Sequence, residues 1–226
     1  NLQGINNKVN GAGNTTETGS NNIQINGTKN TSEGSTTNCF INGSYNTIAN
    51  GVNGATAVGT LAEATANNSI VLGGNATKDY SGGTKSDRIG ERQNITIMFG
   101  TVTTDNSTVD SYLNNVIGSY FAVPINTVIA FQTETIAVRV GGTAAGNLGD
   151  FKAFIEVGGA RFDKTGSAGV DKSRTIIANV GTTSGWLSDV TVSGGNIVQQ
   201  VKGANNRTIE WVTTMRITQL KTDVSI

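Results

Sequence analysis

Apolar residues follow two different patterns along this 226-residue chain. In the first third they are sparse and recur at intervals of 16 residues. Beyond it they alternate with polar residues, as in the run from Ile95 to Phe99. Alternation with a period of two is typical of a β-strand with one buried face. The chain therefore divides into a repeat (1–77), a polar connector (78–92) and a β-strand region (93–226).

The repeat begins three times with the pattern Asn-Gly-x-x-Asn-Thr, at Asn10, Asn26 and Asn42. An apolar residue precedes each Asn-Gly, and Ala57 continues the phase in the next copy. Asn-Gly is a turn signal, and self-similarity at a fixed period indicates stacked supersecondary units. The repeat therefore predicts stacked coils, each with an Asn-Gly turn and a short apolar strand.

Each of these coils contains only two or three sizeable apolar residues. Ordering the backbone costs about 1–2 kcal/mol for each residue, so one chain is expected to be unable to bury a core of its own. Several chains whose apolar strands meet on a common axis can do so, and a three-chain prism is the simplest closed form. The recurrent Asn14, Asn30 and Asn46 are expected to stack as an amide ladder, in preference to holding an ion on a threefold axis.

Residues 55–76 follow a pattern of small, variable, small and apolar residues ending in Gly, as in Ala55-Thr56-Ala57-Val58-Gly59. This pattern resembles the head repeats of trimeric autotransporter adhesins and the similar repeats of phage tail fibres. The resemblance implies a trimeric parallel β-roll. It is looser over 1–54, where Asn-Gly replaces the usual Ala-Gly or Ser-Gly.

The second region predicts an antiparallel, jelly-roll-like β-sandwich, because about eight strands fall within roughly 135 residues. A short helix is expected at 107–116. In the strand at 127–140 the apolar parity changes after Phe131, which predicts a β-bulge or a crossing between two sheets near 132–135. In the next strand the apolar residues are at odd positions, from Phe151 to Val157. The expected strands are 95–99, 119–123, 127–140, 151–157, 174–179, 186–192, 196–201 and 209–217.

A second resemblance covers residues 93–220. Its motifs are, in order, Tyr120 to Phe131, Thr135 to Arg139, Trp186, Val190 to Val192, Gly194 to Val198, and Thr208 to Val212. This order is similar to a sandwich domain found near the C-termini of phage and prophage tail fibres. The resemblance implies the tip of a virion fibre, and it carries no catalytic residue with it.

Composition and charge remove several classes of function. The 16 basic and 16 acidic residues cancel, so a nucleic-acid partner is not expected. The absence of His excludes Ser-His-Asp catalysis, and a single Cys excludes an intrachain disulfide and a Cys-cluster metal site. No cofactor or metal is expected. No apolar run approaches the roughly 20 residues of a membrane helix, so membrane insertion is not expected either. The chain starts without Met, and we interpret it as part of a longer protein.

Candidate chemistry is sparse. Three carboxylates near predicted strand ends could form a pair for glycan hydrolysis, although solvated turn residues are the favoured reading: Asp87, Asp105 and Asp110. Among the aromatic residues, Trp186 and Trp211 are expected in the core. Tyr120 could also stack on a sugar ring, and the better candidates for exposed contacts are Tyr80 and Tyr112. Cys39 is expected to be a small buried residue and not a reactive thiol.

The favoured function is the distal, receptor-binding part of a homotrimeric bacteriophage tail fibre or tailspike, located in the virion and joined to upstream fibre segments. It is expected to be non-catalytic and to attach by multivalent binding to a bacterial surface glycan or outer-surface protein. Two alternatives stay open: a trimeric adhesin on the bacterial cell surface, and a non-catalytic fragment of a polysaccharide-degrading tailspike. The expected binding loops are 103–117, 141–149 and 163–173.

Overall fold

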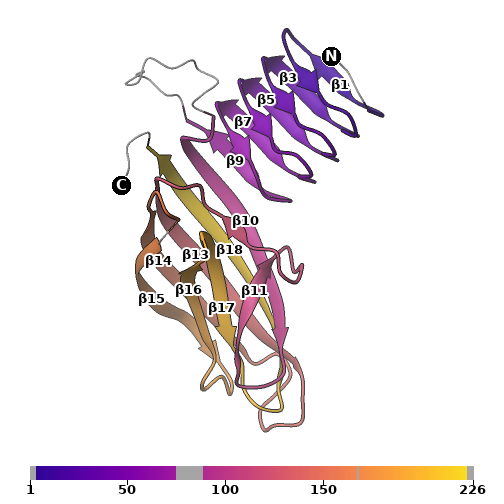
Figure 1. The fold of residues 1–226 in the computed structure, drawn as a ribbon. Coiled ribbons are helices and arrows are strands. Elements are labelled where there is room, and N and C mark those ends of the chain that lie inside the picture. Colours follow the sequence, from indigo (N-terminus) through magenta and orange to yellow (C-terminus); the bar gives the residue numbers. More distant parts are fainter. Residues whose placement is uncertain (1–3, 75–88, 167, 223–226) are drawn as a thin grey trace. The chain divides into compact units, whose positions relative to one another are not determined.

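The computed structural model describes residues 4–74, 89–166 and 168–222, which fall into two compact units (Figure 1). Among the described residues, the first unit contains those up to Ile97 and those from Thr218 to Thr222, and the second contains Met98–Ile217. All regular elements of the described residues are β-strands, which confirms the all-β class. In this part of the chain no helix is long and apolar enough to cross a membrane.

The first unit is a β-solenoid built from two parallel sheets. Ile25 pairs with Ile41 and Ile41 with Ala57, so successive coils are 16 residues apart, whereas the step from Ala57 to Val71 is 14 residues. β10 (Arg92–Thr103) pairs antiparallel with the last strand of the larger sheet. The larger sheet consists of β1 (Lys8–Asn10), β3 (Gln24–Thr28), β5 (Phe40–Ser44), β7 (Thr56–Thr60) and β9 (Ile70–Gly73). The smaller sheet consists of β2 (Thr15–Thr16), β4 (Thr31–Ser32), β6 (Thr47–Ile48) and β8 (Glu63–Ala64).

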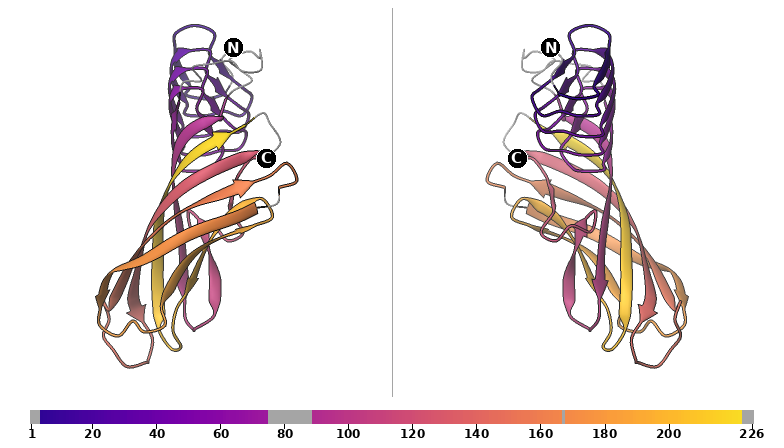
Figure 2. Two further views of the ribbon diagram at one scale, coloured as in Figure 1. Left: turned by 90° about the vertical axis from the view of Figure 1, so that its left-hand side faces the viewer. Right: turned by 90° about the vertical axis from the view of Figure 1, so that its right-hand side faces the viewer.

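A single chain closes every coil of the solenoid around its own interior (Figure 2). Ile25, Ile41 and Ala57 have no exposed surface. The expectation that one chain supplies too few apolar side chains for a core is therefore wrong. The physical reason is that polar side chains also fill the interior: Thr16, Ser20, Asn30, Ser32, Thr36 and Asn46 are fully buried.

The predicted amide ladder is confirmed, and it runs within one chain. The Oδ1 of Asn14 accepts a hydrogen bond from the backbone N–H of Asn30 at 3.0 Å, and the Oδ1 of Asn30 accepts from the N–H of Asn46 at 3.0 Å. The Oδ1 of Asn46 then accepts from the N–H of Ala62 at 2.9 Å, where the ladder ends. Each side-chain amide also donates to a backbone carbonyl of the next coil, so these buried polar groups are satisfied.

The Asn-Gly pairs were predicted to form turns, but two of them lie inside strands. Asn26-Gly27 lies inside β3 and Asn42-Gly43 inside β5. Gly43 has a φ of +123°, and a Cβ built there would lie 1.9 Å from the carbonyl oxygen of Gly59. The same carbonyl accepts the amide of Asn46. Glycine recurs because the next coil passes too close for any side chain, and the recurrent Asn binds the carbonyl that makes this approach.

Replacing a ladder residue tests this account. Asn46→Ala removes an acceptor from the N–H of Ala62 and a donor from the carbonyl of Gly59 in a fully buried place. We expect it to lower the free energy of unfolding by about 2–3 kcal/mol, because buried groups left without partners cost about 1–3 kcal/mol each. Urea unfolding followed by far-ultraviolet circular dichroism measures the loss. The control is Asn42→Ala, an exposed Asn of the same coil, and equal losses for both would contradict the ladder's role.

The second unit has two layers of antiparallel strands (Figure 2). In one layer the order is β10-β18-β13-β14-β15, and in the other β17 pairs with β11, β12 and β16. β11 also pairs with β10 and links the layers. The strands are β11 (Thr108–Leu113), β12 (Phe121–Ala122), β13 (Thr127–Gly141), β14 (Phe151–Phe162), β15 (Ala168–Val180), β16 (Leu187–Ser193), β17 (Asn196–Lys202) and β18 (Thr208–Lys221).

The core of this unit contains both tryptophans, as predicted. Trp211 lies 6.2 Å from Trp186 and is stacked on Phe154 at 6.5 Å between ring centroids. The cluster is completed by Ala137, Val201 and Ile209. Beside it a buried polar chain crosses between the layers, from Gln199 through Ser188 and Thr135 to Thr213. These residues come from four different strands, and their hydrogen bonds are 2.8–3.0 Å long.

Two local predictions for this unit are wrong. The helix expected at 107–116 is β11 followed by a turn, because Val109, Ser111 and Leu113 alternate with outward-facing polar residues and pair with strands on both sides. The bulge expected in β13 is absent, since β13 pairs with β14 in one register from Thr127 to Val138. Thr133 and Thr135 occupy the buried positions instead, and Ile136 and Val140 face outward.

Candidate functional site

The candidate site is a groove on the layer formed by β11, β16 and β17. It has a volume of about 330 Å³. Strand alternation determines its floor, because every second residue of these strands points away from the other layer. Arg174 of β15 reaches its side. The groove is lined by Thr108, Arg174, Leu187, Asp189, Gln200, Val201 and Lys202.

A row of polar side chains crosses the outer surface of this layer at one level. Gln200 pairs in register with Asp110 on one neighbouring strand and with Asp189 on the other. Its Nε2 donates to the Oδ1 of Asp110 at 3.0 Å. The sequence of groups along the row is therefore carboxylate, amide, carboxylate.

Two tyrosines extend the row beyond Asp110. The hydroxyl of Tyr120 donates to the Oδ2 of Asp110 at 2.7 Å, and its ring meets that of Tyr112 edge-on at 5.6 Å. The hydrogen bond to the Asp110 carboxylate raises the pKa of Tyr120 to about 12. The phenol therefore stays protonated and holds the carboxylate in place. The structure thus brings together three predicted candidates, Asp110, Tyr112 and Tyr120.

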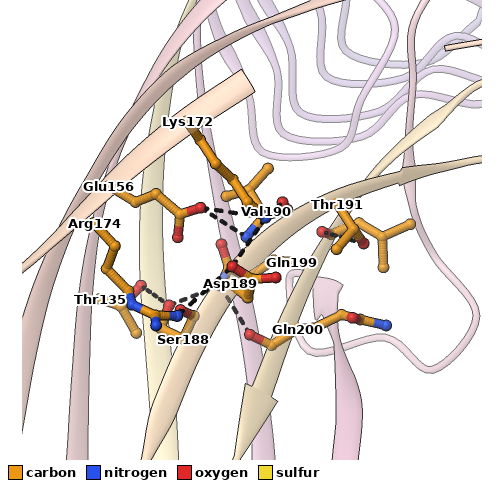
Figure 3. A network of polar contacts seen from close by, with 11 residues as sticks. Thr135, Glu156, Lys172, Arg174, Ser188, Asp189, Val190, Thr191, Gln199 and Gln200 are labelled. Carbon is orange, nitrogen blue, oxygen red and sulfur yellow. Dashed lines mark hydrogen bonds and ion pairs between the residues drawn. The ribbon is translucent and has the colours of Figure 1, made fainter. Parts of the chain in front are cut away.

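On the other side, the row joins a charged network that closes the edge of β16 (Figure 3). Lys172 donates to the carbonyl of Val190, and Arg174 donates to the carbonyl of Ser188. The backbone N–H of Val190 donates to the Oε1 of Glu156 at 3.1 Å. Side chains of β14 and β15 therefore satisfy backbone groups of β16, which among the described strands pairs with β17 alone. The network fixes Arg174 and Asp189 where they line the groove.

The network also contains a carboxylate pair that the sequence did not reveal. The Nζ of Lys172 lies 3.6 Å from the Oε1 of Glu156 and 2.9 Å from the Oδ1 of Asp189. Burial raises the pKa of Glu156, as in the general acid of a glycosidase. However, Glu156 has no exposed surface and Lys172 lies between the two carboxylates. In this arrangement Glu156 can stabilise the strand edge but cannot reach a bound ligand.

The other predicted site residues either have a structural role or lie outside the described residues. The Oδ1 of Asp105 accepts from the N–H of Ser107 at 2.7 Å and shapes a turn. Asp87 and Tyr80 lie outside the described residues. Cys39 is buried and donates to the carbonyl of Thr37, and burial raises the pKa of its thiol, which fits a structural residue. No cluster of three or more metal-ligating side chains occurs in the described ranges.

The three loops expected to bind lie at different places. Loop 141–149 is held by Arg139, whose guanidinium donates to four backbone carbonyls of the loop. It lies beside the loop at 203–207, which also contacts Asn106. The predicted range 103–117 contains β11, and 163–173 contains the start of β15, so only 163–166 are described there as a loop. That segment follows the opposite end of β14.

The groove residues Asp189, Gln200 and Arg174 were missed by sequence reasoning. The sequence signal that could have identified them is the alternation of inward and outward residues along the strand. In Val198-Gln199-Gln200-Val201-Lys202 the positions of Gln200 and Lys202 share a face, and that face is opposite the one of Val201. Asp110, Gln200 and Asp189 form one row only because β11, β17 and β16 pair in a particular register. The sequence of any one of these strands does not reveal that register.

No protein-family model matches the chain, and no curated protein matches it. Among solved structures, the chain is similar to a tailspike protein gp49 from Acinetobacter baumannii bacteriophage Fri1, a capsular polysaccharide depolymerase. The identity is 7% and the TM-score is 0.33, and the match covers 97% of this chain and 48% of that one. A tailspike of Acinetobacter baumannii phage AM24 gives 10% identity and a TM-score of 0.26, with coverage of 97% and 50%. The chain spans about half the length of these tailspikes. Both TM-scores are below 0.5.

Proposed function

We propose that this chain is the distal, receptor-binding part of a homotrimeric bacteriophage tail fibre, and that the groove on β11, β16 and β17 binds a glycan of the bacterial surface. The solenoid is the shaft of the fibre and the second unit is a β-sandwich head. The order of a repeat followed by a layered β domain agrees with the two resemblances found in the sequence. The protein acts by attachment, without chemistry of its own.

The observation that supports this function is the row of Asp110, Gln200 and Asp189 beside Arg174. A sugar hydroxyl both donates and accepts hydrogen bonds, so a glycan site needs carboxylate acceptors next to amide or guanidinium donors. The row offers both within neighbouring strands. The half-exposed rings of Tyr112 and Tyr120 provide apolar surface beside it, on which the face of a sugar ring can pack.

Three copies of the site in one fibre can bind a receptor tightly even if each single site binds it weakly. Once one head has bound, the other two meet further glycan units at a high effective concentration, so the avidity exceeds the affinity of one site. A shallow groove that is open to solvent is sufficient for a receptor that repeats along a cell surface.

Glycan binding can be tested with a single substitution in the row. Gln200→Ala removes the central amide, and we expect at least a tenfold loss of affinity, which corresponds to about 1.4 kcal/mol. The measurement is binding of the full chain to an array of purified bacterial surface polysaccharides. The matched control is Gln24→Ala, the same change at an exposed position of the solenoid. Equal binding by both variants would exclude the groove as the site.

The same samples separate attachment from degradation. We expect no new reducing ends when the chain is incubated with a polysaccharide that it binds. Release of oligosaccharides would favour a polysaccharide-degrading tailspike and would make the carboxylates of this unit the first residues to substitute.

A further inference from the structure

The layer β10-β18-β13-β14-β15 has a second, outward face in the second unit, which we call the outer face. Eight aliphatic side chains on it are 42–53% exposed: Met98, Val102, Val128, Ile136, Val140, Val157, Val180 and Val212. Val138, Phe151 and Ile155 lie among them and are half-buried. From the areas that such side chains bury, the exposed parts of the eight amount to roughly 300 Å². The largest apolar patch of a typical monomeric protein measures about 300–600 Å² and is often functional, so the outer face is a candidate for contact with a partner.

This layer carries apolar side chains on both of its faces. An antiparallel sheet with one wet face carries its polar residues outside and its apolar residues inside. In β13 the buried inward positions include Ile129 and Phe131, yet Ile136 and Val140 on the outward side are apolar as well. In β14 the buried face includes Phe154, whereas Val157 on the outward side is exposed. The outward alternation of both strands therefore also presents apolar side chains on a face that one chain leaves uncovered.

The outer face carries charges of both signs. Glu134 and Arg216 form an ion pair at 3.3 Å, and both side chains are about half exposed. Strand parity places Arg161, Asp171 and Glu210 on the same face. A partner of one strong charge would be repelled by part of this set. In a contact between two copies, basic residues of one copy can pair with acidic residues of the other, so the charge pattern fits a partner that is another copy of this chain.

We infer that copies of this chain meet through the outer face, with Ile136 near the centre of the contact. The inference deepens the proposed homotrimer and rests on it, since it names the surface at which the copies pack. Because the solenoid buries its own interior, the repeat does not need to supply this contact. The inward polar chain of Thr135, Ser188 and Gln199 remains within each copy.

The test is the mass of the full chain in solution, measured by light scattering. The wild type is expected at about 70 kDa, three copies of 23.4 kDa. Ile136→Glu places a charge on the outer face at a half-exposed position and is expected to give a mass near that of one copy. The control is Ile117→Glu, the same change at a turn residue that is 86% exposed, which is expected to keep the mass of the wild type. Circular dichroism establishes that both variants are folded.

A second variant keeps the inference testable if Ile136→Glu fails to fold. The thiol of Ile136→Cys should react at least tenfold more slowly with a maleimide in the assembled protein than in a dilute, dissociated sample. Cys39, the only native thiol, is buried and supplies the background rate. Equal rates in the two samples would overturn the inference.

The outcomes distinguish this inference from the proposed function. If Ile136→Glu keeps the mass of the wild type, the outer face is not the contact, and the trimer and the groove are unaffected. If the wild type itself has the mass of one copy, the inference and the trimer are both wrong, while glycan binding by the groove is judged by the Gln200→Ala result. A two-copy wild type that Ile136→Glu dissociates would support the outer face and contradict the threefold assembly.

Discussion

The Gly43→Ala variant is expected to lose the solenoid. The added methyl group would lie 1.9 Å from the carbonyl oxygen of Gly59, and the φ of +123° is one that residues with a side chain avoid. Such a backbone conformation costs about 1–3 kcal/mol, and overpacking adds about 1–3 kcal/mol. We therefore expect a loss of about 4 kcal/mol, a large part of the 5–15 kcal/mol that stabilises a typical domain.

The control for this variant separates the close contact from the backbone conformation. Gly51 also has a positive φ, of +75°, but a Cβ built there has no atom within 4 Å. Gly51→Ala should therefore cost only about 1 kcal/mol. Urea unfolding by circular dichroism measures both variants. Trp186 and Trp211 lie in the second unit, so their fluorescence reports on that unit alone. Equal losses for the two glycines would contradict the close approach of the coils.

The second large effect is expected at Trp211. The Trp211→Ala variant removes a side chain that is 1% exposed and packs on both Trp186 and Phe154. Truncation of a buried aromatic residue typically costs about 3–5 kcal/mol. The change also leaves the buried hydroxyl of Thr103 without the Trp211 Nε1–H donor that lies 2.9 Å away. We expect the second unit to unfold at a correspondingly lower urea concentration, as followed by circular dichroism.

Conservative substitutions at the two tryptophans isolate the hydrogen bond. The Nε1 of Trp186 is buried and has no hydrogen-bond partner among the described residues. Trp186→Phe therefore removes an unsatisfied group, whereas Trp211→Phe breaks a bond. We expect Trp211→Phe to be the more costly by about 1–2 kcal/mol. A greater loss for Trp186→Phe would show that packing, and not the bond to Thr103, dominates at this pair.

The period of the repeat and the Asn ladder could be predicted from sequence because both are local and recur without interruption. The predicted need for other chains failed for a specific reason. It counted only apolar side chains, whereas Asn30, Ser32 and Thr36 fill the interior with their hydrogen bonds satisfied. Burial of a satisfied polar group does not carry the penalty of an unsatisfied one, so such groups belong to the core.

The candidate groove was predictable only in part. Asp110, Tyr112 and Tyr120 were identified as candidates, but Gln200 and Asp189 join them only through the pairing of three strands that are up to 90 residues apart in sequence. The parity of β13 was misread for a related reason. A pattern shows which residues share a face but does not show which face of the sheet is covered.

Because successive coils pair in a fixed register, the number of coils determines the length of the solenoid. Each coil repeats its neighbour after 16 residues, and adjacent strands of a sheet are about 4.8 Å apart. Duplicating one coil would therefore lengthen the stack by that amount and return every Asn and Gly to its place. An insertion of 15 residues would instead put a side chain where a carbonyl passes. The coil of 14 residues contains Ala62, where the ladder has already ended. The length of the solenoid can thus change only by whole coils.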